Sequence, residues 1–309
     1  MTTNMRAIGP RILVGAVLMV AIPALAEAKG PKVFDTPEAA AQGMIDALAA
    51  NTRTAIEDLL GDEHNDTLFT EDEAAEKENR KLALAAAQEA MTLEEADSDT
   101  RTMLIGKQKW PVPFPIVQTA AGWQFDAEAG LYELLARRIG ANELAAIATL
   151  RAYVDAQREY AVDDHDNDDV LEYAQKVVST EGKKDGLYWQ IEDGSNEPAS
   201  PLGEFAAEQA GYLAGHDRDD PLRGYNFRIL TRQGEGAPGG RHDYIINGNM
   251  IAGFGMIATP SDYGVTGVMT FITSQSGKVY EADLGDETEL EAAAIQQFDL
   301  DDGWSVVKK

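Results

Sequence analysis

The sequence predicts an α+β protein in which helices and antiparallel strands occupy separate stretches of the chain. The early segments repeat apolar residues at helical spacing behind capping residues, and the segments between 91 and 125 change to a period of two. The last third is rich in glycine and in short β-prone runs. We therefore expect N-terminal helices with a small antiparallel meander, followed by a long helix packed on a Gly-rich antiparallel sheet.

Helix signals dominate the stretch up to residue 89. Thr36 is a suitable N-cap and Pro37 a suitable first helical residue. A second short helix is predicted to begin after Thr52 and to end at Gly61. A third, very polar helical stretch is predicted over residues 70–89.

Strand signals follow. Residues 91–96 and 100–105 flank a polar turn at 97–99 and predict a hairpin. Three alternate prolines within residues 110–117 cannot lie in the middle of a sheet, so this stretch is predicted as an edge or extended segment. Ala121 and Gly122 are predicted to form a turn that leads into a further strand over residues 123–126.

The second half should begin with a helix over residues 131–139, which Gly140 ends, and a longer one that Asn142 caps and that runs to about Tyr160. A hairpin turn is expected at residues 274–277. The β-prone runs are residues 225–230, 244–246, 250–257, 267–272 and 278–280. We therefore expect two domains after a signal peptide at residues 1–26, one over 27–137 and one over 138–309.

The first residues have the parts of a secretory signal. Arg6 and Arg11 precede an apolar run over residues 12–24 that is too short to span a membrane comfortably. Cleavage is predicted after Ala26, with Ala28 as the alternative. We expect a periplasmic or secreted protein with no membrane span after cleavage.

Composition restricts the partners and the chemistry. The formal net charge is −27, which disfavours nucleic acid and anionic lipid and favours divalent cations, basic proteins or cationic polymers. Solubility alone is sufficient to explain most of this charge. The chain has no cysteine, which excludes disulfides, thiol nucleophiles and thiolate metal sites.

An acidic loop at residues 163–172 carries the sharpest chemical signal. Its acidic residues at alternate positions can converge on one hard cation, as in a calcium loop. The predicted ligands are Asp164, Asp166, Asp168 and Glu172. Asp169 and Gln175 depart from the calcium pattern, which has glycine and glutamate at these positions. The alternative is a solvated acidic loop that binds no metal.

Other motifs are less specific. The glycines of residues 234–239 match a phosphate-binding spacing, but no helix follows, so we expect turns and close backbone packing. The four histidines form no recognisable catalytic or metal pattern, although His216 and His242 are each followed by an aspartate. The aromatic residues of the second half favour a sheet core over a binding surface. They are Tyr188, Trp189, Tyr212, Tyr225, Tyr244 and Tyr263.

Several stretches resemble an uncharacterised family of exported bacterial proteins, a domain of unknown function. They are residues 110–116, 122–126, 137–144, 155–160, 185–189, 237–240 and 268–271. The resemblance covers essentially the whole mature chain and implies no established activity.

A second resemblance concerns residues 142–160 together with 224–228, 258–267 and 271–280. They are similar to the helix and sheet of type IV pilin-like and pseudopilin heads. A pilin has a long apolar half-helix directly before this segment, whereas here a polar domain occupies that place. The resemblance therefore implies a pilin-like head that does not polymerise through the usual helix.

In the absence of a catalytic constellation, we expect a non-catalytic cell-envelope protein that binds or assembles with a protein or polymer partner, with calcium as a stabilising ion. The alternative is a periplasmic hydrolase of a cell-wall or exported polymer that uses carboxylates or a His-Asp pair in a cleft between the two expected domains.

Overall fold

The structure is a computed structural model that describes residues 29–69, 73–191, 198–203, 205 and 221–308. The predicted signal peptide lies outside these residues. The chain divides into two compact units, Met1–Glu128 and Ala129–Lys309. Helices and antiparallel sheets make up both units, which confirms the α+β class.

Among the described residues, unit 1 begins with the three predicted helices and with one short helix, the third along the chain, that was not predicted. They are α1 (Pro37–Ala50), α2 (Arg53–Leu60), α3 (Asn65–Leu68) and α4 (Glu73–Glu89). The hydroxyls of Thr36 and Thr52 each accept a hydrogen bond of 3.2 Å from the backbone three residues later, so both predicted caps are confirmed. The predicted start of the third helix, Thr70, lies outside the described residues.

The strands of unit 1 are β1 (Met91–Glu95), β2 (Thr100–Ile105), β3 (Trp110–Pro111), β4 (Ile116–Thr119) and β5 (Gly122–Phe125). Their order is β1-β2-β4-β5, and β3 pairs with β2. The predicted hairpin is the antiparallel pair β1–β2. Apolar side chains on one face of the sheet, including Met103 and Phe125, are buried against the helices. Pro113 and Pro115 lie outside the strands, in the extended connection before β4.

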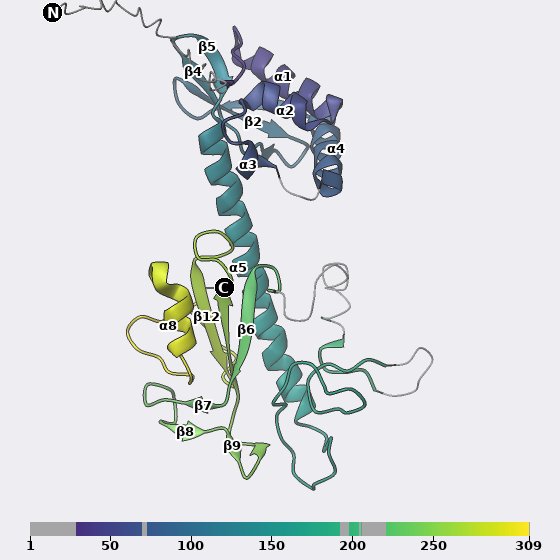
Figure 1. Ribbon diagram of the computed structural model, residues 1–309, viewed down its shortest axis with the longest axis vertical. Coiled ribbons are helices and arrows are strands. Elements are labelled where there is room, and N and C mark those ends of the chain that lie inside the picture. Colours follow the sequence, from purple (N-terminus) through teal and green to yellow (C-terminus); the bar gives the residue numbers. More distant parts are fainter. Residues whose placement is uncertain (1–28, 70–72, 192–197, 204, 206–220, 309) are drawn as a thin grey trace, which may run out of the picture. The chain divides into compact units, whose positions relative to one another are not determined.

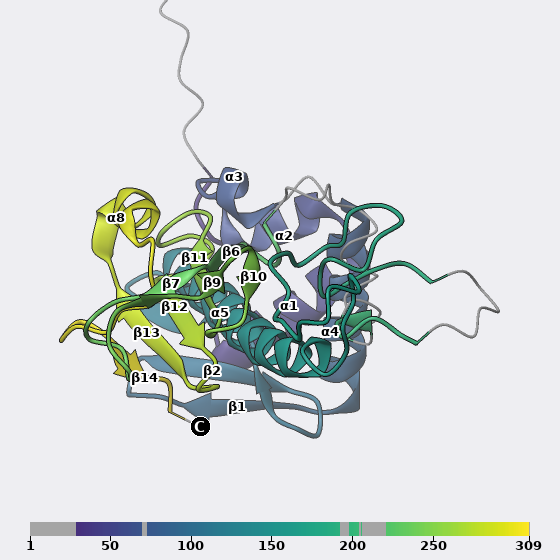
Figure 2. The ribbon, with the colours of Figure 1, turned by 90° about the horizontal axis from the view of Figure 1, so that it is seen from below.

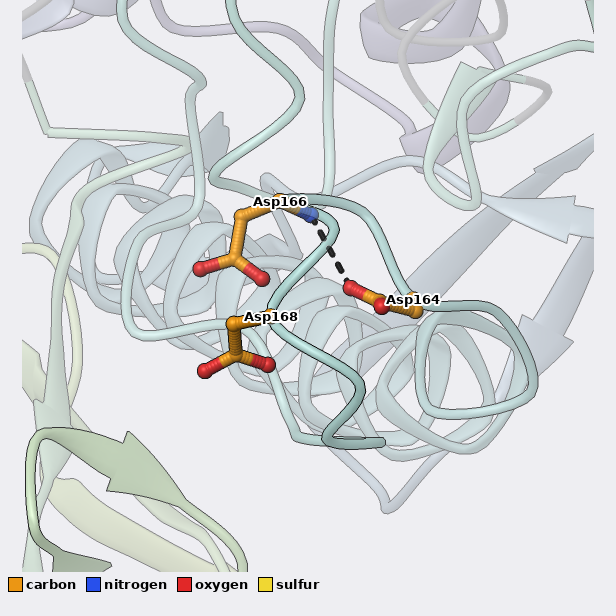
Figure 3. A group of neighbouring side chains, drawn as sticks. All are labelled: Asp164, Asp166 and Asp168. Carbon is orange, nitrogen blue, oxygen red and sulfur yellow. Dashed lines mark hydrogen bonds between the residues drawn. The ribbon is translucent and has the colours of Figure 1, made fainter.

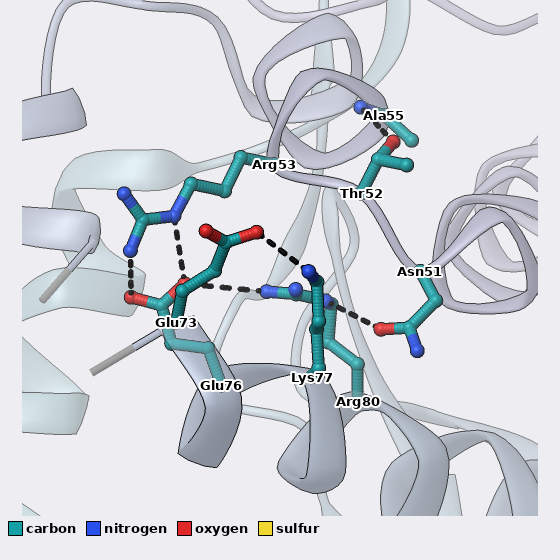
Figure 4. A network of polar contacts seen from close by, with 8 residues as sticks. All are labelled: Asn51, Thr52, Arg53, Ala55, Glu73, Glu76, Lys77 and Arg80. Atoms are coloured by element: carbon teal, nitrogen blue, oxygen red, sulfur yellow. Dashed lines mark hydrogen bonds and ion pairs between the residues drawn. The ribbon is translucent and has the colours of Figure 1, made fainter. Parts of the chain in front are cut away.

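An ionic network joins the helices of unit 1 (Figure 4). Arg53 on α2 donates two hydrogen bonds, of 3.0 and 3.1 Å, to the carboxylate of Glu76 on α4. Arg80, whose side chain is 9% exposed, contacts the same carboxylate at 3.5 Å and donates to Oδ1 of Asn51 at 3.0 Å. Because Asn51 ends α1, the network fixes three helices to one another.

The helix of unit 2 differs from the prediction. Helix α5 runs without a break over Ala127–Tyr160, so the predicted end at Gly140 is wrong and the expected domain boundary at 137/138 lies inside this helix. Gly140 has open space around it and needs no left-handed backbone. A single glycine in a helix costs only about 1 kcal/mol relative to alanine, which packing elsewhere can offset.

Long-range contacts replace the predicted cap. The amide of Asn142 donates to the backbone oxygen of Thr266 at 2.8 Å instead of capping a new helix. The neighbouring carboxylate of Glu143 accepts hydrogen bonds from the backbone nitrogens of Val268 and Met269 at 3.1 and 3.0 Å. These contacts fix the middle of α5 against the start of a strand.

The main sheet of unit 2 has strand order β14-β13-β12-β11-β6. Its strands are β6 (Tyr225–Leu230), β11 (Gly255–Pro260), β12 (Met269–Ser274), β13 (Val279–Asp283) and β14 (Ser305–Val306). Helix α5 packs on one face, where Leu150 and Phe271 are buried, and α8 (Thr288–Ala294) lies on the other (Figures 1 and 2). The second face holds a smaller cluster that includes Ile257 and Phe298.

Two short ribbons complete unit 2. One pairs β7 (Arg232–Gln233) with β8 (His242–Asp243), and the other pairs β9 (Ile245–Ile246) with β10 (Asn249–Met250). Each β-prone run of the sequence therefore contains at least part of a strand. Within the described residues, no helix is both long and apolar enough to span a membrane.

Candidate metal centre

The acidic loop begins where α5 ends. Gln157 and Tyr160, in the last turn of the helix, are buried in the core of unit 2 and fix the position at which the chain leaves it. His165 stacks on the ring of Tyr160 with a centroid distance of 4.0 Å, and its Nε2 lies 3.0 Å from the backbone oxygen of the same residue. The loop is therefore held back against its own helix.

Asp164 organises the loop from within. Its Oδ1 accepts hydrogen bonds from the backbone nitrogens of Asp166 and Asn167 at 3.3 and 2.8 Å, and its Oδ2 accepts one from Asp169 at 2.9 Å. Partial desolvation raises the pKa of Asp164, but these backbone hydrogen bonds outweigh it and lower the pKa below its usual value. The carboxylate is therefore kept in its charged form.

The loop makes its turn without glycine. Asn167 and Asp169 have φ angles of 63° and 65°, in the left-handed region. Aspartate and asparagine tolerate this region better than most other residues. Asp169 therefore makes the sharp turn at the position where calcium loops usually have glycine.

The turn brings three of the four predicted ligands together (Figure 3). One carboxylate oxygen from each of Asp164, Asp166 and Asp168 lies within 4.8 Å of the others. Asp164 is partly buried, whereas Asp166 and Asp168 are exposed to solvent. The group is thus open on one side, so water can complete the coordination of an ion.

The fourth predicted ligand has another partner. The carboxylate of Glu172 accepts a hydrogen bond of 3.1 Å from the backbone nitrogen of Met250, and Tyr173 forms a bridge with the same residue. Asp168 accepts a hydrogen bond of 2.7 Å from the amide of Asn249. The loop is therefore attached to the β9–β10 ribbon, an attachment that the sequence pattern could not indicate.

The electrostatics of the loop favour a cation. Three carboxylates stand close together and repel one another, and they follow the C-terminal end of α5, where the helix dipole is also negative. Each of the three carboxylates offers one oxygen to the group, and carboxylate oxygen is the ligand type that Ca²⁺ prefers. Without sulfur or an imidazole in the group, a soft transition metal is a poorer match.

The other candidate residues have structural contacts. The ring nitrogens of His242 lie 3.1 and 3.3 Å from the backbone oxygens of Gly240 and Ala252, not against Asp243. A side chain at Gly234 or Gly236 would collide with the segment around Asp299, so this glycine pattern serves close packing, as predicted. His216 lies outside the described residues.

Three of the six aromatic residues named in the second half belong to the core. Trp189, Tyr225 and Tyr244 are buried, and the hydroxyl of Tyr225 donates to the backbone oxygen of Met269 at 2.8 Å. Tyr188 and Tyr263 are half-buried. Tyr212 lies outside the described residues. The core interpretation is therefore confirmed for the three buried side chains.

No curated protein and no solved structure matches the chain. The resemblance to pilin-like heads therefore stays a prediction. One family matches residues 31–307, nearly the whole chain, and its description is "Protein of unknown function (DUF2950)". This match agrees with the resemblance to a family of unknown function noted in the sequence. The chain belongs to the DUF2950 family.

Proposed function

We propose that this protein is an exported, non-catalytic cell-envelope protein that binds or assembles with a partner, and that its acidic loop binds calcium, which stabilises unit 2. The observation that carries the proposal is the convergence of Asp164, Asp166 and Asp168 in a turn with two left-handed residues. The basic N-terminal segment, followed by an apolar run, supports the exported location.

Calcium is the preferred ion for two reasons. The group offers only carboxylate oxygens, and it is open to solvent at Asp166 and Asp168, which suits a cation that takes six to eight oxygens in flexible geometry. Mg²⁺ demands near-ideal octahedral geometry and dehydrates reluctantly, so a solvent-exposed loop should bind it more weakly. A bound ion would stabilise the folded state because the unfolded chain holds no such arrangement.

Thermal unfolding of the mature chain tests this proposal. The midpoint is measured in chelator, in millimolar Ca²⁺ and in millimolar Mg²⁺, for the parent and for Asp166→Ala. Free calcium at about a hundred times Kd stabilises by about 2.7 kcal/mol, which raises the midpoint by about 5 to 10 °C for a unit of this size. Asp166→Ala should abolish this rise.

Asp163→Ala is the matched control. It removes one exposed aspartate from the same loop, outside the group of three, and should respond to calcium like the parent. The proposal is wrong if magnesium gives the same rise as calcium, or if Asp166→Ala and Asp163→Ala respond alike. Equal rises would mean that the loop has no preference for calcium, and equal responses of the two variants would mean that it is only a solvated acidic surface.

The alternative is a periplasmic hydrolase of a cell-wall or exported polymer. A hydrolase with paired carboxylates would release soluble fragments from purified cell wall, and a binding protein would only co-sediment with it or with a protein partner. Fragment release by the purified mature chain would therefore replace our proposal with the enzyme.

A further inference from the structure

Strand β1 leaves one edge of the unit 1 sheet open. It pairs with β2 on one side, and among the described residues no strand pairs with its other side. The backbone nitrogen of Ala96 donates to the oxygen of Thr100 at 3.2 Å, and hydrogen-bonded pairs alternate along an antiparallel ladder. It follows that Leu93 and Glu95 direct their backbone N–H and C=O groups outward, away from β2.

The opposite edge of this sheet is closed. There, Phe34 and Trp123 exchange two backbone hydrogen bonds, of 2.7 and 2.8 Å, so β5 already has a partner. Along the path β1-β2-β4-β5, the open edge is therefore the outer side of β1. An exposed edge of this kind is a template for pairing with another extended segment.

The two faces beside this edge differ in character. On the face that carries the core, Met91 and Leu93 are half-buried and leave part of their apolar surface uncovered. On the other face, the exposed Glu94 stands opposite Thr102. Next to it lies a hollow of about 520 Å³. The hollow is lined by Glu94, Glu95, Ala96, Thr102, Leu104, Lys109 and Pro111.

The charge around the edge is negative. Glu94 and Glu95 are followed by Asp97 and Asp99 in the turn, and all four are exposed. Arg101 forms an ion pair with Glu95 at 3.8 Å, and Lys109 also lines the hollow. A second copy of the chain carries the same negative charge, in total and at this edge, which disfavours self-pairing through β1. The complementary partner is a basic segment.

We propose that β1 binds an extended basic segment of a partner protein by strand addition. The partner's backbone would pair with Leu93 and Glu95, its apolar side chains would cover Met91 and Leu93, and its lysine or arginine side chains would contact Glu94 and the hollow. Because side chains alternate along a strand, the partner sequence should alternate apolar and basic residues. This inference rests on the proposed binding role, but not on the calcium loop.

Fluorescence anisotropy with labelled peptides tests the proposal, at physiological salt to screen non-specific attraction and in chelator to exclude calcium. The first probe is a short peptide of alternating lysine and valine. The second has the same composition in two blocks, so it keeps the charge but loses the alternation. The third is the alternating peptide with N-methyl groups on the amides that would face β1. We expect the second and third to bind at least about tenfold more weakly than the first.

Two variants of Glu95 distinguish the contribution of backbone pairing from the contribution of charge. Glu95→Gln removes a carboxylate and should weaken binding of the alternating peptide about two- to fivefold. Glu95→Pro also removes an outward N–H that β2 does not use, and should weaken it at least about tenfold. The N-methyl peptide gives the same information on the unmodified chain, should the proline variant fail to fold.

Equal binding of the block and alternating peptides, or equal loss in the two Glu95 variants, would overturn the proposal, since the attraction would then be general charge. Binding of a cationic polysaccharide without binding of the alternating peptide would also overturn it. If the peptide fails while calcium still raises the unfolding midpoint, this inference falls and the calcium function remains.

Discussion

Gln157 offers the clearest test of what holds the acidic loop in place. Its side chain is completely buried in the last turn of α5. Its amide nitrogen donates to the backbone oxygen of Ala174 at 2.8 Å and to the hydroxyl of Tyr153 at 3.0 Å, and its oxygen accepts from the backbone nitrogen of Ala174 at 2.8 Å. This residue therefore fastens the chain that follows the loop to the helix that precedes it.

The substitution Gln157→Leu keeps the size of the side chain and removes these hydrogen bonds. Leucine fills nearly the same volume, so no large cavity forms. The backbone N–H and C=O of Ala174, which is 1% exposed, are left without their partner. Each buried unsatisfied group costs about 1–3 kcal/mol, so with two such groups we expect the free energy of unfolding of unit 2 to fall by about 2–6 kcal/mol.

Denaturant unfolding followed by tryptophan fluorescence measures this change as a shift of the midpoint at constant slope. The control is Gln42→Leu on α1, where the exposed amide makes a hydrogen bond of 2.9 Å to Asp46. That variant should lose less than about 0.5 kcal/mol. If Gln157→Leu is no more destabilising than Gln42→Leu, the reasoning about buried hydrogen bonds at this site is refuted.

Three further predictions concern stability. Glu76→Gln leaves two arginines without their carboxylate and should destabilise unit 1 by about 1–3 kcal/mol in denaturant unfolding, whereas the exposed Glu78→Gln should have little effect. The hydrogen bond from Lys176 lowers the pKa of Asp185 to about 2. The ionised carboxylate of Asp185 therefore stabilises the folded state above about pH 4, and this stabilisation is lost as the pH falls toward 2. The difference in free energy of unfolding between the parent and Asp185→Asn should shrink over this range in acid titrations. Gly140→Ala should raise the stability of unit 2 by about 0.5–1 kcal/mol, seen as a higher melting temperature, because open space surrounds this helical position.

Local signals identified much of the fold. Thr36 and Thr52 could be recognised as caps because a cap depends on residues only three positions away. The helix end predicted at Gly140 is wrong because distant contacts decide the conformation around this glycine. Its neighbours Asn142 and Glu143 are held by residues more than a hundred positions later, and no local pattern reports such contacts. Tertiary packing therefore overrode the propensity of the glycine.

The candidate site was predictable to a similar extent. Alternate spacing correctly indicated that Asp164, Asp166 and Asp168 converge, because a tight turn dictates which side chains share a side. Glu172 followed the same pattern but bonds to Met250, a partner far along the chain. The left-handed backbone of Asp169 could not be inferred either, since most aspartates do not adopt it.

Strand β11 belongs to two cores at once. Met256 and Ala258 face the cluster beneath α5, whereas Ile257 between them faces the cluster that contains Phe298. Because β11 contributes to both cores, opening one core would also detach this strand from the other core. Partly unfolded states of unit 2 that keep one core intact should therefore be scarce. A protease cleaves a folded protein mainly through such partly open states. We therefore expect the sharing of this strand to slow proteolysis of unit 2, in a chain that has no disulfides to do so.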